Sequence, residues 1–431
     1  MALGKSDNQA AAVDIELPLK GHRSALTLLV LAFTLSIADR MILSILFPDI
    51  KAEFGLSDMQ LGMLGGLTFA LFYATLGIPI ARLADQYNRK IILIVCLVLF
   101  SVMTALSGFA SGFIMLLLLR IGVGVGEAGV NPSSHSIIAD YFPAHRRAFA
   151  MAILMVGANL GMMLGFAGGG FIAEHYGWRV ALMAMGIPGL LLAAVMAYGL
   201  KEPARGSFEG PGSSLESTPV LHTALAMWRN LAMRHLIIAS IITGMISYGF
   251  TQWLPTFFVR SHHMAQSDVG AMMALFFGIL GVAGALIVGK LADRLAPKGF
   301  QYGVWLICGL QLLAIPFWFF GISMADINSV LWLLVIPAFV SNSYLGPSLA
   351  LIQTLSPVGS RAVASAIKML CLNLIGLGLG PLMVGSLSDW LQPVHGDGSL
   401  AIALSSFSLL GIWAALHFFL CGSALAQSHV Q

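Results

Sequence analysis

Five Asp, Glu, Lys and Arg side chains lie in the interior of otherwise apolar stretches of the sequence: Asp39, Arg40, Arg120, Glu127 and Lys368. A charge at the centre of a bilayer costs roughly 2.5–3.5 kcal/mol on insertion scales unless it is paired or hydrated. Such residues therefore tend to mark pathways for ions and polar solutes. The chemistry that they offer is proton uptake and release by the carboxyls, and anion binding by the cationic groups.

The rise of an α-helix predicts which of these residues meet. At about 1.5 Å per residue, Asp39 lies ~20 Å from the amino-terminal end of its apolar stretch. Arg120 lies in a stretch running the other way, ~19 Å from the same side of a bilayer core ~30 Å thick. We therefore expect Asp39 and Arg120 to face each other or to share a polar cavity. Glu127 follows Arg120 by two helical turns, so we expect it on the same face, ~10 Å nearer that side.

These positions predict a role in coupling transport to protons. Burial favours a protonated carboxyl and a nearby arginine favours the charged form, so Asp39 and Glu127 are predicted to exchange protons. Arg40, Arg120 and Lys368 are predicted to bind the substrate or to form the central ion pair. The alternatives are static ion pairs that fix helix packing and, for Arg40 and Lys368, side chains that extend to the nearer interface.

The composition predicts the elements that hold these residues. Of 431 residues, 58% are hydrophobic and 10% are charged, whereas a soluble domain has about 25% charged residues. A helix crossing a bilayer needs roughly 20 apolar residues. Twelve such stretches occur, at about 25–47, 59–80, 91–109, 113–138, 149–173, 179–199, 235–258, 268–289, 301–321, 329–354, 363–387 and 399–424. We predict an all-α membrane protein with twelve transmembrane helices.

The basic residues predict the orientation. With the amino terminus in the cytoplasm, sixteen of the 22 Lys and Arg residues fall on the cytoplasmic side, three fall outside and three lie within the stretches. Cytoplasmic connections carry such an excess of basic residues. We expect both termini in the cytoplasm and the protein in a bacterial inner membrane. The polar first 20 residues contain no apolar run with a cleavage site, so no removable signal peptide is expected.

The sequence repeats itself on the two sides of a polar segment. ARLADQYNRK at 81–90 matches GKLADRLAPK at 289–298, and Ser57-Asp58 matches Ser267-Asp268, with both serines suited to helix N-caps. Two six-helix units repeated in the same orientation place a substrate site near the midplane between them. The predicted organisation is a tail at 1–23, a bundle at 24–200, a flexible linker at 201–234, a pseudo-symmetric bundle at 235–424 and a tail at 425–431.

The same segments resemble a known family. The loop at 81–90 resembles the signature between helices 2 and 3 of the major facilitator superfamily. Residues 38–62, ADRMILSILFPDIKAEFGLSDMQLG, and 120–148, RIGVGVGEAGVNPSSHSIIADYFPAHRRA, are similar to the Spinster branch, as is HYGWR at 175–179. The resemblance implies the major facilitator fold and a proton-linked or facilitative carrier of an amphipathic substrate, such as a lysolipid or a sphingoid-like lipid.

Two further sets of residues have predicted roles. The resemblance suggests that four charged loop residues latch the cytoplasmic ends of the halves together: Asp85, Arg89, Asp293 and Arg294. The alternative is that these charges only follow the positive-inside bias. Polar and aromatic residues within the stretches are candidates for lining the cavity, or for hydrogen bonds between helices: Asn159, Tyr248, Gln252, Trp253, Asn342, Gln353 and Asn373.

The sequence favours a transporter over other classes. GVGEAG at 124–129 matches the dinucleotide fingerprint, but inside an apolar stretch it indicates close helix packing. With no P-loop and no metal-ligand spacing, we expect no cofactor and no metal, and neither an enzyme nor a channel. The predicted partners are the lipid bilayer, protons and a small-molecule or lipid-like substrate, with no nucleic acid, and the predicted state is a monomer. The alternative function is organic-anion/proton symport.

Overall fold

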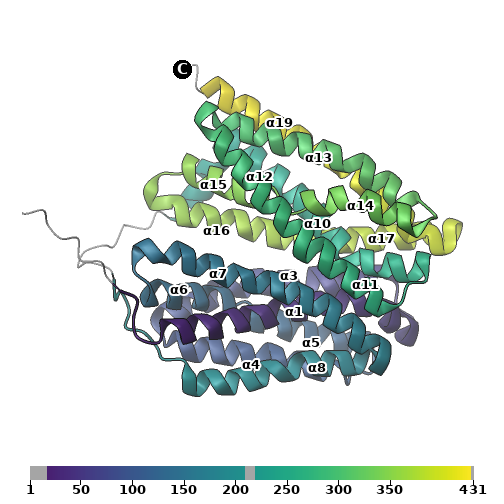
Figure 1. The fold of residues 1–431 in the computed structure, drawn as a ribbon, viewed down its shortest axis with the longest axis horizontal. Helices are drawn as coiled ribbons and strands as arrows, with labels where there is room; N and C mark the ends of the chain where they lie inside the picture. Colours follow the sequence, from purple (N-terminus) through teal and green to yellow (C-terminus); the bar gives the residue numbers. More distant parts are fainter. Residues whose placement is uncertain (1–16, 209–218, 429–431) are drawn as a thin grey trace, which may run out of the picture.

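The computed structural model describes residues 17–208 and 219–428, which form helices joined by short connections (Figure 1). The first half comprises α1 (His22–Phe54), α2 (Asp58–Gly62), α3 (Thr68–Gln86), α4 (Arg89–Ser107), α5 (Phe113–Glu127), α6 (Val130–Tyr141), α7 (Ala144–Met163) and α8 (Gly169–Gly199). The second comprises α9 (Val220–Arg229), α10 (Leu231–His262), α11 (Gln266–Met273), α12 (Gly281–Leu295), α13 (Phe300–Ser323), α14 (Ile327–Val340), α15 (Leu345–Leu355), α16 (Arg361–Cys371), α17 (Gly378–His395), α18 (Ser399–Ser408) and α19 (Leu410–Ser428). π-Helical turns join α2 to α3, α7 to α8, α11 to α12 and α16 to α17.

Ten continuous stretches of these helices are long and apolar enough to cross a membrane. Two of them contain 56 and 67 residues, whereas one crossing needs roughly 20. The first is broken at Gly177, whose φ of 82° and ψ of 159° are not helical. The second is broken between α17 and α18, at residues 396–398. The described residues therefore supply twelve crossings in an all-α fold, which confirms the predicted fold class.

The helices form two bundles side by side, α1–α8 in one and α10–α19 in the other (Figure 1). α1 begins and α19 ends at the same end of the molecule, on the left of the view. We call this the linker end, because the chain leaving α8 lies there: the Lys201 carbonyl accepts a hydrogen bond from Tyr141, at the end of α6. We call the opposite end, where α2 and α11 begin, the seam end.

The connection between the bundles differs from the predicted flexible linker at 201–234. Residues 220–229 form the helix α9, and α10 begins at Leu231. Thr223 and Met227, four residues apart, are buried on one face of α9, which gives this short helix a packed side despite its polar surroundings. Residues 209–218, most of the Gly/Ser/Pro-rich run, lie outside the described residues. α19 runs to Ser428, past the predicted boundary at 424.

Small residues bring the charge-bearing helices close to their neighbours. A Cβ added to Gly161 of α7 would lie 2.3 Å from the Thr34 carbonyl oxygen of α1. A Cβ added to Gly126 of α5 would lie 2.6 Å from the Phe100 nitrogen of α4. Helices in lipid approach each other where side chains are small, because no hydrophobic drive pulls them together. Close packing therefore explains the glycines at 124–129, as predicted, and it holds α7 against α1 and α5 against α4.

Candidate functional site

The first buried ion pair joins α1 to α5. Arg120 Nη1 lies 3.3 Å from Asp39 Oδ2, and both side chains are 2% exposed. The Thr104 hydroxyl of α4 donates a hydrogen bond to the other oxygen of Asp39. The structure thus brings together the two residues that the helical rise placed at the same depth. Thr104 holds one carboxylate oxygen while the arginine holds the other.

The second buried ion pair joins the same two helices nearer the linker end, since Glu127 lies two helical turns beyond Arg120 on α5. Arg40 Nη2 lies 2.6 Å from Glu127 Oε2, which also accepts a hydrogen bond of 2.9 Å from Ser36. The Arg40 guanidinium lies 4.5 Å from the centre of the Phe69 ring and 5.1 Å from that of Tyr73. Cation–π contacts of this kind stabilise a guanidinium away from water.

The two pairs form one electrostatic unit, which we call the charge cluster: Asp39, Arg40, Arg120 and Glu127. Phe69 lies between the two guanidiniums, 4.5 Å from that of Arg40 and 5.7 Å from that of Arg120. Glu127 also interacts electrostatically with Asp39 and Arg120. A change of charge at either carboxyl therefore alters the energy of all four groups.

Several polar atoms of the charge cluster are buried without a hydrogen-bond partner among the described residues. They are Nε of Arg40, Nε and Nη2 of Arg120, and Oε1 of Glu127. Buried polar atoms are nearly always paired with protein groups or ordered water, because leaving them unpaired costs free energy. The spare donors and the spare acceptor give the cluster capacity to bind water, a proton or a polar ligand group.

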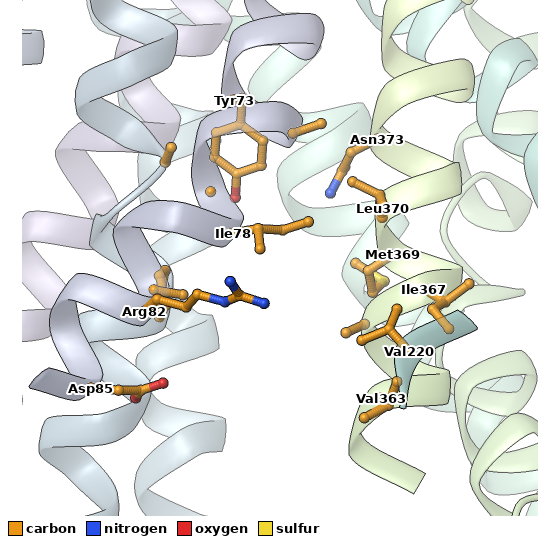
Figure 2. A pocket seen from close by; sticks show the side chains of 16 residues that line it. Tyr73, Ile78, Arg82, Asp85, Val220, Val363, Ile367, Met369, Leu370 and Asn373 are labelled. Atoms are coloured by element: carbon orange, nitrogen blue, oxygen red, sulfur yellow. The ribbon is translucent and has the colours of Figure 1, made fainter. Parts of the chain in front are cut away.

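A cavity of about 410 Å³ lies between the halves on the linker side of this cluster (Figure 2). α3 supplies one wall, with Tyr73, Ile78 and Arg82, and α16 supplies the facing wall. Most of the lining is apolar: Ala74, Gly77, Ile78, Ala81, Ala128, Pro132, Val220, Val363, Ala366, Ile367, Met369 and Leu370. Tyr73 lines the cavity and also contacts Arg40. Tyr73 therefore links the cavity to the charge cluster.

The cavity ends toward the seam where the two halves touch. A Cβ added to Gly378 of α17 would lie 3.4 Å from the Cβ of Ala70, one turn before Tyr73. Nearer the seam end, a Cβ on Gly66 would lie 2.8 Å from the Leu377 carbonyl oxygen. At the seam end itself, Arg260 of α10 binds both carboxylate oxygens of Asp58 at 2.8 and 2.9 Å. The cavity is thus open toward the linker end and closed toward the seam end.

Lys368 lies apart from the charge cluster. It is buried on α16, and its ammonium group donates a hydrogen bond to the Ser348 hydroxyl of α15. Among the described residues no carboxylate lies within ion-pair distance of it. Lys368 therefore forms no central ion pair in this conformation, and its predicted role in substrate binding stays a prediction. The reason is that Ile367 and Leu370 face the cavity while Lys368 faces its own half.

The four predicted gate residues form no bond between the halves in the part of the chain that the structure describes. Arg89 pairs with Asp140 of α6 and with Glu202, which follows α8 in the connection, so neither pair reaches the second half. The Asp85 carbonyl accepts a hydrogen bond from Arg205, and Asp293 and Arg294 are exposed. The latch therefore stays a prediction for a state in which the linker end is closed.

Asn373 lines the cavity, as predicted, and its amide projects into it (Figure 2). The other six predicted lining residues have different surroundings. Gln252 donates to the Gly65 carbonyl of the other half at 2.8 Å, and Trp253 donates to Pro381 at 2.8 Å. The rest are bonded locally, half-buried near Arg40 or placed in a turn: Asn159 to Met155, Gln353 to Ser365, Tyr248 near Arg40, and Asn342 between α14 and α15.

Sequence reasoning missed the groups that orient the cluster. Ser36, Thr104 and Phe69 contact its charges, and Tyr73 connects it to the cavity, which Arg82 also lines. The two hydroxyls were visible as polar residues in apolar stretches. Their partners were not, because serine and threonine in such helices often bond to their own backbone instead.

The fold and the site define a membrane transporter built from two repeated bundles. The family model of the Major Facilitator Superfamily matches residues 29–381, and the chain belongs to that family. Within it, the resemblance to the Spinster branch is confirmed by a solved structure, a bacterial homologue of the human lysosomal transporter Spinster in an inward-facing, unoccupied conformation. That structure is 26% identical, with a TM-score of 0.85, over 95% of this chain and 98% of the homologue.

Two relatives show the range of transport within the family. An MFS-type efflux pump of Mycolicibacterium smegmatis is 34% identical over 386 residues, 88% of each chain. The cis,cis-muconate transport protein of Acinetobacter baylyi is 26% identical over 399 residues, which cover 91% of this chain and 90% of the relative. The chain is accordingly an integral membrane transporter and not an enzyme.

Proposed function

We propose that the protein is a proton-coupled carrier of an amphipathic molecule with an anionic or zwitterionic headgroup, such as a lysolipid or a sphingoid-like lipid. The observation that carries this proposal is the charge cluster. Two carboxyls, each bound to an arginine, are buried beside an apolar cavity. The cluster supplies groups that exchange protons, and the cavity supplies a surface for an alkyl chain.

The coupling follows from how each arginine is held. Protonating Glu127 removes the charge that binds Arg40, and protonating Asp39 does the same for Arg120. A freed guanidinium then has donors for an anionic headgroup, in addition to those already unpaired. Substrate binding and proton binding are thereby linked, because both compete for the same arginines.

The transport cycle is alternating access between the two halves. The basic residues support placing the linker end in the cytoplasm of a bacterium, with the protein in its inner membrane and both termini inside. The cavity then faces inward, the orientation named for the Spinster homologue. Because residues of both halves line the cavity within one chain, a monomer suffices.

The test is transport of a fluorescent lysolipid in proteoliposomes with and without a pH gradient. One pH unit is worth about 1.4 kcal/mol per proton, so coupling to one proton gives about a tenfold change in the concentration ratio. We expect Asp39→Asn and Glu127→Gln to lose this dependence while exchange down a gradient persists.

The matched control is Glu53→Gln. Glu53 is also bound to an arginine of its own half, Arg179, at 2.5 Å, but it lies at the seam end and is partly exposed. This variant should respond to the gradient as the parent does. If Asp39→Asn is still driven by the gradient at the parental rate, Asp39 is not the coupling residue.

The second candidate is organic-anion/proton symport. It is favoured by the similarity to a muconate transport protein over nearly the whole chain. The charge cluster serves this function equally well, but the apolar lining of the cavity does not help to bind a small dicarboxylate. Adding muconate to the transport assay separates the candidates: gradient-driven muconate uptake without lysolipid transport would establish the second.

A further inference from the structure

We infer that Arg82 is the first headgroup-binding residue for substrate coming from the linker end. This inference rests on the proposed function and deepens it. Arg82 projects from α3 into the cavity toward α16 (Figure 2). It is the one cationic residue in the lining among the described residues. An amphiphile with an anionic headgroup would place that group at Arg82 and its alkyl chain against Ile367 and Leu370.

Availability distinguishes Arg82 from the deeper arginines. Arg40 and Arg120 are bound to carboxylates at 2.6 and 3.3 Å, and neither of them lines the cavity. Arg82 is exposed and has no hydrogen-bond or ion-pair partner within the described ranges. Its guanidinium can therefore bind an anion without breaking an existing pair, whereas the charge of each deeper arginine is already balanced by a carboxylate and only its remaining donors are free.

The position on the helix also favours binding at the mouth. Asp85, one turn further along α3, lines the same cavity nearer its mouth, and no ion pair joins it to Arg82 in the described part of the chain (Figure 2). Arg82 thus lies between the outer part of the cavity and Tyr73, on the path to the charge cluster. A headgroup held at Arg82 is placed to move next to Arg40 or Arg120 once protonation frees one of them.

The repeat supplies a matched control for this inference. Residues 81–90 correspond to 289–298, so Lys290 of α12 is the counterpart of Arg82 in the second half. Lys290 is exposed and is not part of the cavity lining. Neutralising either residue removes one positive charge at the linker end, but we expect only the change at Arg82 to alter the cavity.

The experiment measures protection of a cysteine inside the cavity by a soluble amphiphile. Met369→Cys lines the cavity from α16, and Cys371→Ser removes the partly exposed native thiol nearby. In this background the rate of maleimide labelling is measured in nanodiscs against increasing octyl phosphate, with octyl glucoside as a neutral probe of equal chain length. Arg82→Gln, Arg82→Lys and Lys290→Gln are compared with the parent.

We expect octyl phosphate to protect the parent, and Arg82→Gln to raise the half-protecting concentration about tenfold, since a hydrogen-bonded charge is lost. Arg82→Lys should fall between the two, because it keeps the charge but not the paired donors. Protection by octyl glucoside should not change, and Lys290→Gln should match the parent.

Three results would overturn the inference, and they differ in what they say of the proposed function. Protection of Arg82→Gln equal to the parent removes Arg82 as the binding residue and leaves the amphiphile cavity standing. A shift as large in Lys290→Gln, or with octyl glucoside, shows a general effect of charge or structure. Absence of protection in the parent contradicts both the inference and the proposed cavity.

Discussion

The seam end and the linker end are held together in opposite ways. At the seam end, polar groups bond from one half to the other: Arg260 to Asp58, and Gln266 to Asp49 at 2.9 Å. At the linker end, Arg89 is tied to its own half. The contrast shows what fixes the conformation. The halves are joined where bonds cross between them, and the cavity opens where the charged groups are satisfied internally.

The seam also follows the internal repeat. Asp389 of α17 accepts hydrogen bonds from the backbone amides of Asp58 and Met59, at 2.8 and 2.7 Å, at the start of α2. Glu174 of α8 accepts one from the Ser267 amide, at 2.9 Å, at the start of α11. In each case a carboxylate of one half caps a helix of the other, where free amides and the helix dipole favour negative charge. The proposed alternating access requires both caps to break.

The largest expected effect comes from adding a side chain where the two halves pack closely at the seam end. A Cβ on Gly170 of α8 would lie 2.3 Å from the Gln266 carbonyl oxygen of the other half. Gly170→Leu should therefore prevent the seam from closing, at a cost of about 3 kcal/mol or more to the closed state. Spin labels at Tyr176 and Asp268, exposed residues on the two sides of the seam, should move apart in double electron–electron resonance measurements.

Gly168→Leu is the control for this change. Nothing lies within 4 Å of a Cβ at Gly168, two residues before Gly170. The added side chain therefore fits without moving the other half, and the distance distribution should match the parent. A parental distribution in Gly170→Leu as well would mean that close packing at this position does not hold the seam shut.

A smaller effect is expected from breaking the ion pair across the seam. Asp58 is 2% exposed and binds Arg260 at 2.8 Å and Lys51 at 2.5 Å. Asp58→Asn leaves both cations without their carboxylate, which should weaken the closed seam by about 2–3 kcal/mol. The same spin-label pair should then show a new population at longer distance.

Glu53→Gln again serves as the comparison, because its partner Arg179 belongs to the same half. It removes an ion pair at the same end of the molecule without removing a bond between halves. Longer distances in this variant would show that any lost charge loosens the seam, and that bonds between the halves have no special role.

Much of the core of the site followed from the sequence, because a helix converts residue number into depth. Asp39 and Arg120 were predictable as partners for that reason. The pairing of Arg40 with Glu127 was not expected, because the two backbones lie at different depths. The long arginine side chain bridges that difference in depth. Depth alone does not fix such a choice.

The helix caps between the halves could not be predicted from the sequence, for a different reason. Ser57 is the helix N-cap that its residue type predicts, with a complete capping box with Gln60. Its repeat counterpart Ser267 is not: the N-cap of α11 is Ala265, and the Ser267 amide bonds to Glu174 instead. Local rules predict caps made within a segment, whereas these carboxylates come from helices far away in the chain.

The smallest effect should come from one of these caps. Asp389→Asn keeps the size of the side chain but removes its charge and one of its two strong acceptors, which are bonded to Asp58 and Met59. A helix cap is worth about 1 kcal/mol, so the ratio of open to closed seam should rise about fivefold.

Asp326→Asn is the control, because Asp326 caps α14 within its own half through Ser329 at 2.9 Å. If both variants shift the spin-label distances equally, caps between the halves contribute nothing particular to closure. If Asp389→Asn alone does, the repeated caps set how readily the seam opens.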